Sequence, residues 1–155
     1  MQILLINVAQ KMPAWVDAGC ADYLKRLPRE LGLTQHTVPL LAGGSRESAA
    51  LRRERQAVQI LAKLRPGHSI ALDDKGSAWT SADWATQLQH WMREYSQVNL
   101  IIGGPDGLAP QCLQACQQRV SLGRMTMPHA LVKLVLIEQL YRAWTISQGH
   151  PYHRD

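Results

Sequence analysis

The sequence predicts an α/β fold in which a parallel sheet carries helices on both faces. Two observations support this prediction. The segments 2–8, 69–72 and 98–102 are nearly continuous apolar runs without polar alternation, as expected for strands that are buried on both faces. The stretches between them space their apolar residues as amphipathic helices do. In sheets of this kind ligands bind beyond the carboxyl ends of the strands, so functional residues are expected there.

Composition and length limit the class of protein. With 155 residues, 46% of them hydrophobic and 19% charged, the chain predicts one globular domain spanning 1–155. No apolar run approaches the roughly 20 residues of a membrane helix, so no membrane association is expected. The first residues lack a basic segment and a cleavage site and are typical of a strand rather than a signal peptide. Three cysteines without a C-x-x-C pair favour free thiols in a reducing cytoplasm.

The first predicted helix lies between the first two predicted strands in the sequence. After the strand at 2–8, Pro13 opens a helix that reaches about Leu27, where Pro28 stops it. A second strand is expected at 33–38. One stripe of the helix is expected to face the core: Trp15, Val16, Gly19, Tyr23 and Leu27.

A basic helix follows the flexible segment 42–45, with Ser45 or Ser48 as its cap and Pro66 and Gly67 at its end. Four small or apolar residues are expected to share its inner face, opposite the arginines: Ala50, Ala57, Leu61 and Leu64.

The second half of the chain repeats the strand and helix pattern. The strand at 69–72 leads to a helix capped by Thr80 or Ser81, and the strand at 98–102 follows it. One side of that helix is expected to carry Trp84, Leu88, Trp91 and Met92.

The longest predicted helix covers 130–147 and is apolar around most of its circumference. Such a helix is either central to the core or shared with another subunit, and in a chain this small we favour a homodimer. Glu138 and Arg142 are four residues apart and are expected to form an ion pair on this helix.

The net charge of +5 comes entirely from residues 1–65, which hold ten basic and five acidic side chains. Most of the excess lies in one segment: Arg46, Arg52, Arg53, Arg55, Lys63 and Arg65. Basic patches of this kind attract nucleic-acid phosphates. The alternative is a solvated helix face, since Glu47 and Glu54 are interleaved with the arginines.

Three strand ends are expected to form one pocket. They are Leu72, the glycines of the turn Gly103-Gly104-Pro105-Asp106-Gly107, and the stretch from Leu122 to Met127. The turn matches neither a P-loop nor the G-x-G-x-x-G pattern, and Asp106 places a negative charge where a pyrophosphate would lie. A nucleoside without phosphates fits better. Met125 and Met127 offer apolar surface for a flat ring, with core packing as the alternative.

Three histidines are candidates for a functional role. His129 follows Pro128 at the start of the long helix, where capping or core packing is as plausible as catalysis. His150 and His153 have a spacing typical of metal ligands, but no third ligand is evident nearby, so no metal is expected.

Four separated motifs, in the same order and spread over essentially the whole chain, resemble the RlmH family of ribosomal RNA methyltransferases, of the SPOUT superfamily. They are Gly103 to Gly107, Met125-Thr126-Met127-Pro128-His129, Glu138-Gln139-Leu140-Tyr141-Arg142-Ala143-Trp144, and the terminal Pro151-Tyr152-His153-Arg154. The resemblance implies a parallel α/β sheet with a C-terminal trefoil knot, assembled as a homodimer. It further implies methylation of N3 of a pseudouridine in large-subunit ribosomal RNA, on assembled ribosomes.

The resemblance also implies the site. S-adenosylmethionine is expected against Leu72, Gly103, Gly104, Leu122, Gly123, Arg124, Met125, Thr126 and Met127. Arg154 is the candidate for stabilising the anion of the target ring, and His153 for accepting its N3 proton. Tyr152 is expected to stack on or orient the base, and Arg142 to position the tail or contact RNA. The alternative for the tail is an ordered segment that closes the interface.

Two competing functions stay open at the level of sequence. One is a related methyltransferase with a different RNA target, and the other is a non-catalytic ribosome-binding factor with the same fold. The glycine turn and the segment from Met125 to His129 argue against the second, because a binding factor does not need them.

Overall fold

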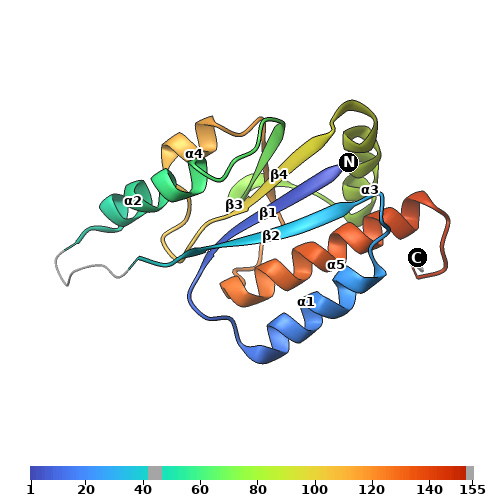
Figure 1. The fold of residues 1–155 in the computed structure, drawn as a ribbon, viewed down its shortest axis with the longest axis horizontal. Coiled ribbons are helices and arrows are strands. Elements are labelled where there is room, and N and C mark those ends of the chain that lie inside the picture. Colours follow the sequence, from blue (N-terminus) through green and yellow to red (C-terminus); the bar gives the residue numbers. More distant parts are fainter. Residues whose placement is uncertain (42–46, 153–155) are drawn as a thin grey trace.

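A computed structural model describes residues 1–41 and 47–152. Its centre is a sheet of five parallel strands in the spatial order β2-β1-β4-β3-β5 (Figure 1). The strands are β1 (Gln2–Ala9), β2 (Gly32–Pro39), β3 (His68–Ala78), β4 (Gln97–Ile102) and β5 (Gln118–Ser121). All the carboxyl ends therefore meet at one edge of the sheet.

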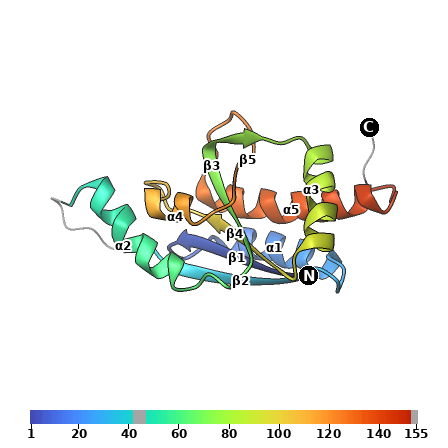
Figure 2. The ribbon, with the colours of Figure 1, turned by 90° about the horizontal axis from the view of Figure 1, so that it is seen from above.

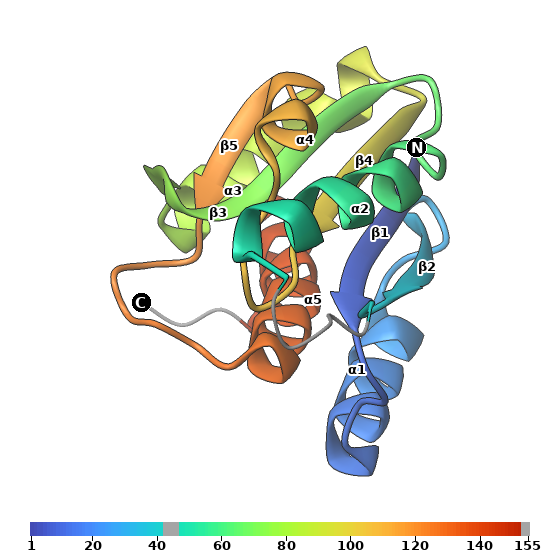
Figure 3. The ribbon, with the colours of Figure 1, turned by 90° about the vertical axis from the view of Figure 1, so that its left-hand side faces the viewer.

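Helices cover both faces of the sheet, as the sequence predicts. One face carries α1 (Ala14–Arg26), α3 (Ser81–Glu94) and α5 (His129–Ser147), and the other carries α2 (Ala49–Leu61) and α4 (Pro110–Gln114). Figure 3 shows α2 and α4 on the near side of the sheet, with the other three helices behind it. No helix in the described part of the chain is long and apolar enough to span a membrane.

β4 shows why the apolar strands lack polar alternation. Leu100 and Ile102 face the core under α1, α3 and α5, while Ile101 faces the core under α2 and α4. Asn99 is also fully buried, and its Nδ2 donates to the Arg65 carbonyl oxygen at 2.8 Å and to Ser69 Oγ at 3.0 Å. Both faces of the strand are thus buried, and its buried polar side chain has hydrogen-bond partners.

The structure decides between the alternative caps. Ser48 caps α2 by accepting the Leu51 N–H at 3.2 Å. Thr80 caps α3 in a reciprocal capping box with Asp83. The sequence placed the end of α2 too late: the helix ends at Leu61, and a turn rather than a helix connects it to Pro66.

Several predicted inner faces need correction. Trp15 is 57% exposed and Met92 37% exposed, so neither belongs to the core face of its helix. The buried residues of α1 are Val16 and Cys20. In α2 the buried residues are Gln56, Ala57 and Ile60, and Ala50 is exposed. Leu61 and Leu64 are half-buried and pack against the same core, as predicted. The errors have one cause: a short helix meets the sheet along a narrow line, so apolar residues beside that line stay in solvent.

The apolar circumference of α5 is covered in large part by its own chain. The helix packs on the sheet between α1 and α3, with Leu136, Ile137 and Leu140 fully buried. At Gly19 of α1, a Cβ atom would lie 3.0 Å from Leu134 Cδ1, so the missing side chain permits close approach of the two helices. Core burial therefore explains much of the pattern from which the sequence favoured a dimer.

Candidate functional site

A cavity of about 830 Å³ lies at the carboxyl edge of the sheet, formed by the irregular middle of β3 and the segments that follow β4 and β5. All nine residues predicted to hold the cofactor line it: Leu72, Gly103, Gly104, Leu122, Gly123, Arg124, Met125, Thr126 and Met127. The three segments predicted to form one pocket do so, although Leu72 lies within β3 rather than at its end.

β3 contributes an irregular segment to the cavity wall. Val120 of β5 pairs first with Leu72 and again with Ser77, so residues 73–76 leave the ladder and bulge toward the cavity. A Cβ atom at Gly76 would lie 2.5 Å from the Val120 backbone nitrogen, which shows how closely β3 and β5 approach here. Asp73 and Arg119 form an ion pair across the two strands.

The turn after β4 is tight because its glycines permit it. The Gly107 N–H donates to the Gly104 carbonyl oxygen at 2.9 Å. Gly107 has a φ of 81°, which L side chains rarely adopt. A Cβ atom at Gly103 would lie 2.9 Å from the Gly107 carbonyl carbon. The backbone can therefore form the cavity wall directly.

Asp106 does not present a free negative charge, contrary to the sequence-based expectation. Arg52 of α2 donates from Nε to Oδ2 at 2.8 Å and from Nη2 to Oδ1 at 3.0 Å. These hydrogen bonds hold the pKa of Asp106 below its usual value, so the carboxylate stays ionised and paired. The pair also ties α2 to the glycine turn.

The loop after β5 is open to solvent. Met125 is 81% exposed, which excludes core packing for this side chain, whereas Met127 is half-buried in the cavity wall. Ser121 fixes the start of the loop: its Oγ donates to the Gly123 carbonyl oxygen at 2.8 Å and accepts the Gly123 N–H at 3.2 Å.

His129, in the first turn of α5, also lines the cavity. Its Nδ1 is buried and has no hydrogen-bond partner among the described residues. A role in capping is not observed, because α5 has no side-chain cap. This placement keeps the catalytic alternative open.

The tail lies against its own chain through Tyr152. The Tyr152 hydroxyl donates to Glu138 Oε1 at 3.1 Å and lies 3.3 Å from the Tyr23 hydroxyl oxygen. The ring packs edge-on against Tyr141, with 4.7 Å between centroids. Burial raises the pKa of Tyr152, and the hydrogen bond with Tyr23 and the charge of Glu138 raise it further, so the hydroxyl is protonated at neutral pH.

Arg142 contacts the tail, which is consistent with positioning the tail, one of the two roles predicted for it. It pairs with Glu138 at 2.7 Å, and its guanidinium carbon lies 5.2 Å from the centre of the Tyr152 ring. The predicted ion pair is confirmed. His153 and Arg154, the candidate base and the candidate for anion stabilisation, lie outside the described residues.

The tail and the cavity are at different ends of α5. His129 begins the helix beside the cavity, and the segment after Ser147 follows its far end (Figure 2). His129 and Glu138 are nine positions apart, or about 14 Å of helix axis, and Val132, which also lines the cavity, is six positions or about 9 Å from Glu138. The structure thus separates the predicted cofactor residues from the Tyr152 and Arg142 pair within one chain.

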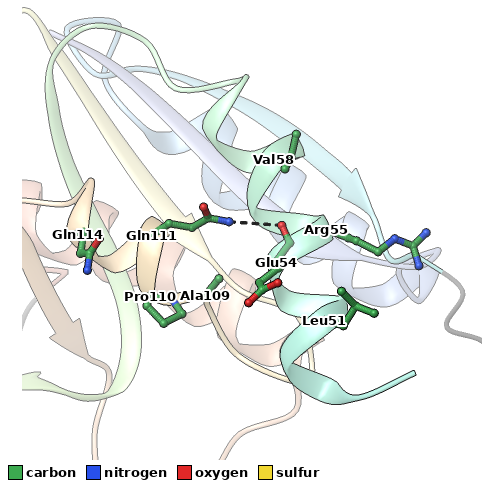
Figure 4. Close-up of a pocket in the computed structure, with 8 residues that line it drawn as sticks. All are labelled: Leu51, Glu54, Arg55, Val58, Ala109, Pro110, Gln111 and Gln114. Carbon is green, nitrogen blue, oxygen red and sulfur yellow. Dashed lines mark hydrogen bonds between the residues drawn. The ribbon is translucent and has the colours of Figure 1, made fainter. Parts of the chain in front are cut away.

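A second, shallower cavity of about 500 Å³ lies between α2 and α4 (Figure 4). Gln111 Nε2 donates to the Glu54 carbonyl oxygen at 3.4 Å across it. Its apolar lining includes the exposed Leu51 and Val58. Among the residues that the structure describes, no group of three His, Cys, Asp or Glu side chains is arranged to hold a metal ion.

The fold and the cavity define the class of protein: a parallel α/β domain with a cavity lined by glycine-containing loops at the carboxyl ends of the strands, where domains of this class bind ligands. Residues 1–153 match a family model described as "Predicted SPOUT methyltransferase". The chain belongs to the SPOUT methyltransferase family.

Individual relatives agree with this assignment. The chain is 42% identical to "Ribosomal RNA large subunit methyltransferase H" of Stutzerimonas stutzeri and of Ectopseudomonas mendocina, over 99% of this chain and 100% of each relative. Two solved methylase family proteins share the fold at low identity. The one from Neisseria gonorrhoeae has a TM-score of 0.52 and 12% identity, covering 90% of this chain and 81% of its own. The one from Haemophilus influenzae has a TM-score of 0.54 and 11% identity, covering 99% and 70%.

Sequence reasoning missed several lining residues that carry charge. Arg53, Asp74, Lys75 and Arg119 border the cavity without belonging to a predicted motif. A signal existed for Arg53, since the basic helix contains it. Arg119 and Asp74 reach the cavity because of the bulge in β3, and no local sequence pattern predicts that bulge.

Proposed function

We propose that this protein is an S-adenosylmethionine-dependent methyltransferase that methylates N3 of a pseudouridine in large-subunit ribosomal RNA, on assembled ribosomes in the cytoplasm. The observation that carries the proposal is the 42% identity, from end to end, with relatives named as large-subunit ribosomal RNA methyltransferases. A match of that extent favours the same reaction over a binding factor that merely kept the fold.

The lining of the cavity supports S-adenosylmethionine as its ligand. Its glycine wall leaves no room for side chains at Gly103, so a ligand contacts the backbone there. Leu72, Leu122 and Met127 add apolar surface suited to the adenine ring. The exposed Met125 is placed to cover a bound nucleoside.

Bound there, the cofactor supplies an electrophilic methyl group. The residues of the chain then have three tasks: to align the target ring, to exclude water and to handle the N3 proton. Arg154 is our candidate for stabilising the ring anion, and His153 for accepting the proton. His129 is a second candidate for the proton, because it lines the cavity and its Nδ1 has no partner among the described residues.

We further propose that the protein acts as a homodimer in which the tail of one subunit completes the cavity of the other. The separation of Tyr152 from the cavity within one chain supports this arrangement. The trefoil knot implied by the family remains part of the proposal. A chain of this size has little surface for reading RNA, which supports recognition of an assembled ribosome rather than a bare sequence.

The test is transfer of labelled methyl from S-adenosylmethionine to assembled ribosomes from cells that lack this gene, with bare ribosomal RNA alongside. We expect incorporation on ribosomes only, mapping to N3 of a pseudouridine. Incorporation at another nucleotide would establish a methyltransferase with a different target. Cofactor binding without any incorporation on either substrate would contradict the proposal.

A further inference from the structure

Arg53 is a positively charged residue in the cavity wall, and it has no role in the reaction proposed above. It comes from α2 and lines the cavity beside the glycine turn. Its Nη1 donates to the Asp106 carbonyl oxygen at 3.4 Å. Its Nε is buried and has no hydrogen-bond partner in the described part of the chain. A buried donor without a partner is costly and points to a ligand group that supplies one.

The neighbouring Arg52 shows what a purely structural arginine looks like here. Its Nε and Nη2 bind the two carboxylate oxygens of Asp106, and its Nη1 donates to the Glu47 carbonyl oxygen at 2.7 Å. All three guanidinium nitrogens are therefore in use. Because Arg52 neutralises Asp106, the cluster of these two residues with Arg53 retains one positive charge, and Arg53 carries it.

Arg53 stands at the rim of the cavity rather than at its floor. It contacts Asp106, and the residues on either side of Asp106, Pro105 and Gly107, are both exposed. The helix that carries it extends past the carboxyl edge of the sheet (Figure 1). A substrate that enters the cavity at this rim passes Arg53 before it reaches the proposed cofactor wall.

We propose that Arg53 binds a phosphate group of the substrate RNA at the rim of the cavity and so positions the target nucleotide. This inference rests on the proposed function. A guanidinium suits a phosphate because its planar set of donors matches two phosphate oxygens. The rim position favours RNA phosphate over the other oxyanion within reach, the carboxylate of the cofactor. Arg53 is a positioning residue in this scheme and takes no part in the chemical step.

The test compares Arg53→Gln, Arg53→Lys and the control Arg93→Gln with the wild-type enzyme. Arg93 is exposed in the last turn of α3, whose end adjoins the amino end of β4, away from the cavity, and its substitution removes the same charge. Methyl transfer to ribosomes gives KM and kcat. Calorimetry gives the Kd for S-adenosylmethionine, and ribosome binding is followed over a range of KCl concentrations.

For Arg53→Gln we expect a KM for ribosomes about tenfold higher with little change in kcat, as for loss of one charged hydrogen bond. The slope of log affinity against log salt should fall by about one. The Kd for the cofactor should not change, which also shows that the variant is folded. Arg53→Lys keeps the charge but not the paired donors, so it should restore the salt slope but only part of the loss in KM. Arg93→Gln should behave as wild type.

Two outcomes would overturn the inference. A weaker cofactor Kd in Arg53→Gln would assign Arg53 to the carboxylate of the cofactor instead. A KM and salt slope equal to those of Arg93→Gln would show that Arg53 binds no oxyanion. Failure of the proposed function is a separate result, because wild-type enzyme would then not methylate ribosomes at all.

Discussion

At the scale of single residues, the role of a polar side chain depends on its hydrogen-bond partners. Arg52 and Arg53 are adjacent in sequence and have the same side chain, yet one is fully paired and the other keeps a buried, unpartnered nitrogen. The difference comes from the helix, which turns consecutive residues about 100° apart. Residue type alone therefore cannot separate a structural arginine from one available to a ligand.

Asp106 gives a prediction on acid stability. Because Arg52 lowers its pKa in the folded state, the stabilisation it contributes is complete above the unfolded value of about 3.9 and is lost as the pH falls through the lower native value. Urea unfolding from pH 2.5 to 7 should show the wild type more stable than Asp106→Asn at neutral pH, with the gap closing in acid. A gap that does not depend on pH would contradict the role of the ion pair.

The thiols of Cys112 and Cys116 should be unreactive in the folded protein. Burial raises the pKa of each to about 11, and the neighbouring Cys112 adds to the shift of Cys116. At pH 8 the thiolate fraction falls about a hundredfold relative to an unperturbed thiol. Alkylation with iodoacetamide, followed by mass spectrometry, should be slower by about that factor in native protein than in urea. Comparable rates in both conditions would show that these thiols are accessible.

At the scale of elements, the start of α3 is fixed by side chains that the sequence displays. Thr80 Oγ accepts the Asp83 N–H at 3.1 Å, and an Asp83 carboxylate oxygen accepts the Thr80 N–H at 2.8 Å. Thr80→Ala should lower the free energy of unfolding by about 1 kcal/mol. Thr80→Ser keeps the accepting oxygen and should lose little. Equal losses in the two variants, measured by urea unfolding, would show that the cap does not stabilise the helix.

The elements also show where sequence reasoning succeeds and where it stops. The strand at 98–102 and the helix at 130–147 were placed nearly to the residue, because long apolar runs and strong periodicity are local signals. β3 was predicted at 69–72 and extends to Ala78. Its extension depends on Val120, which pairs with β3 on both sides of the bulge and lies more than 40 positions away.

The candidate site, too, could be predicted from the sequence only in part. The glycines and the loop after β5 could be assigned to one cavity, because parallel strands bring their carboxyl ends together. The pairing of Asp106 with Arg52 could not be foreseen, since it joins residues 54 positions apart through the docking of α2. The sequence therefore located the cavity but misjudged its charge.

At the scale of the whole molecule, the predicted cofactor residues and Tyr152 lie toward different ends of α5. Tyr152 is tied to Tyr23, Tyr141 and Glu138. If Arg154 acts on the target ring, this separation supports our proposal that it serves the cavity of a second copy of the chain.

Complementation between two inactive variants tests this arrangement. Met127→Arg places a charge in the cavity wall of one subunit, and Arg154→Ala removes the proposed anion-stabilising group from the other. In a heterodimer, the intact cavity of the second variant then faces the intact tail of the first. Co-expression with two affinity tags and tandem purification isolates this species, which should show about half of wild-type methyl transfer, since one of two sites is complete.

The controls are the two variant homodimers, in which every site lacks one part, so each should be inactive. A purified heterodimer without activity would mean that the tail serves the cavity of its own subunit. A chain that sediments as a monomer while methylating ribosomes would exclude the shared site altogether. Activity in the heterodimer alone would establish that the catalytic unit of this enzyme is the pair of subunits, with each α5 separating a cavity from the tail that serves its partner.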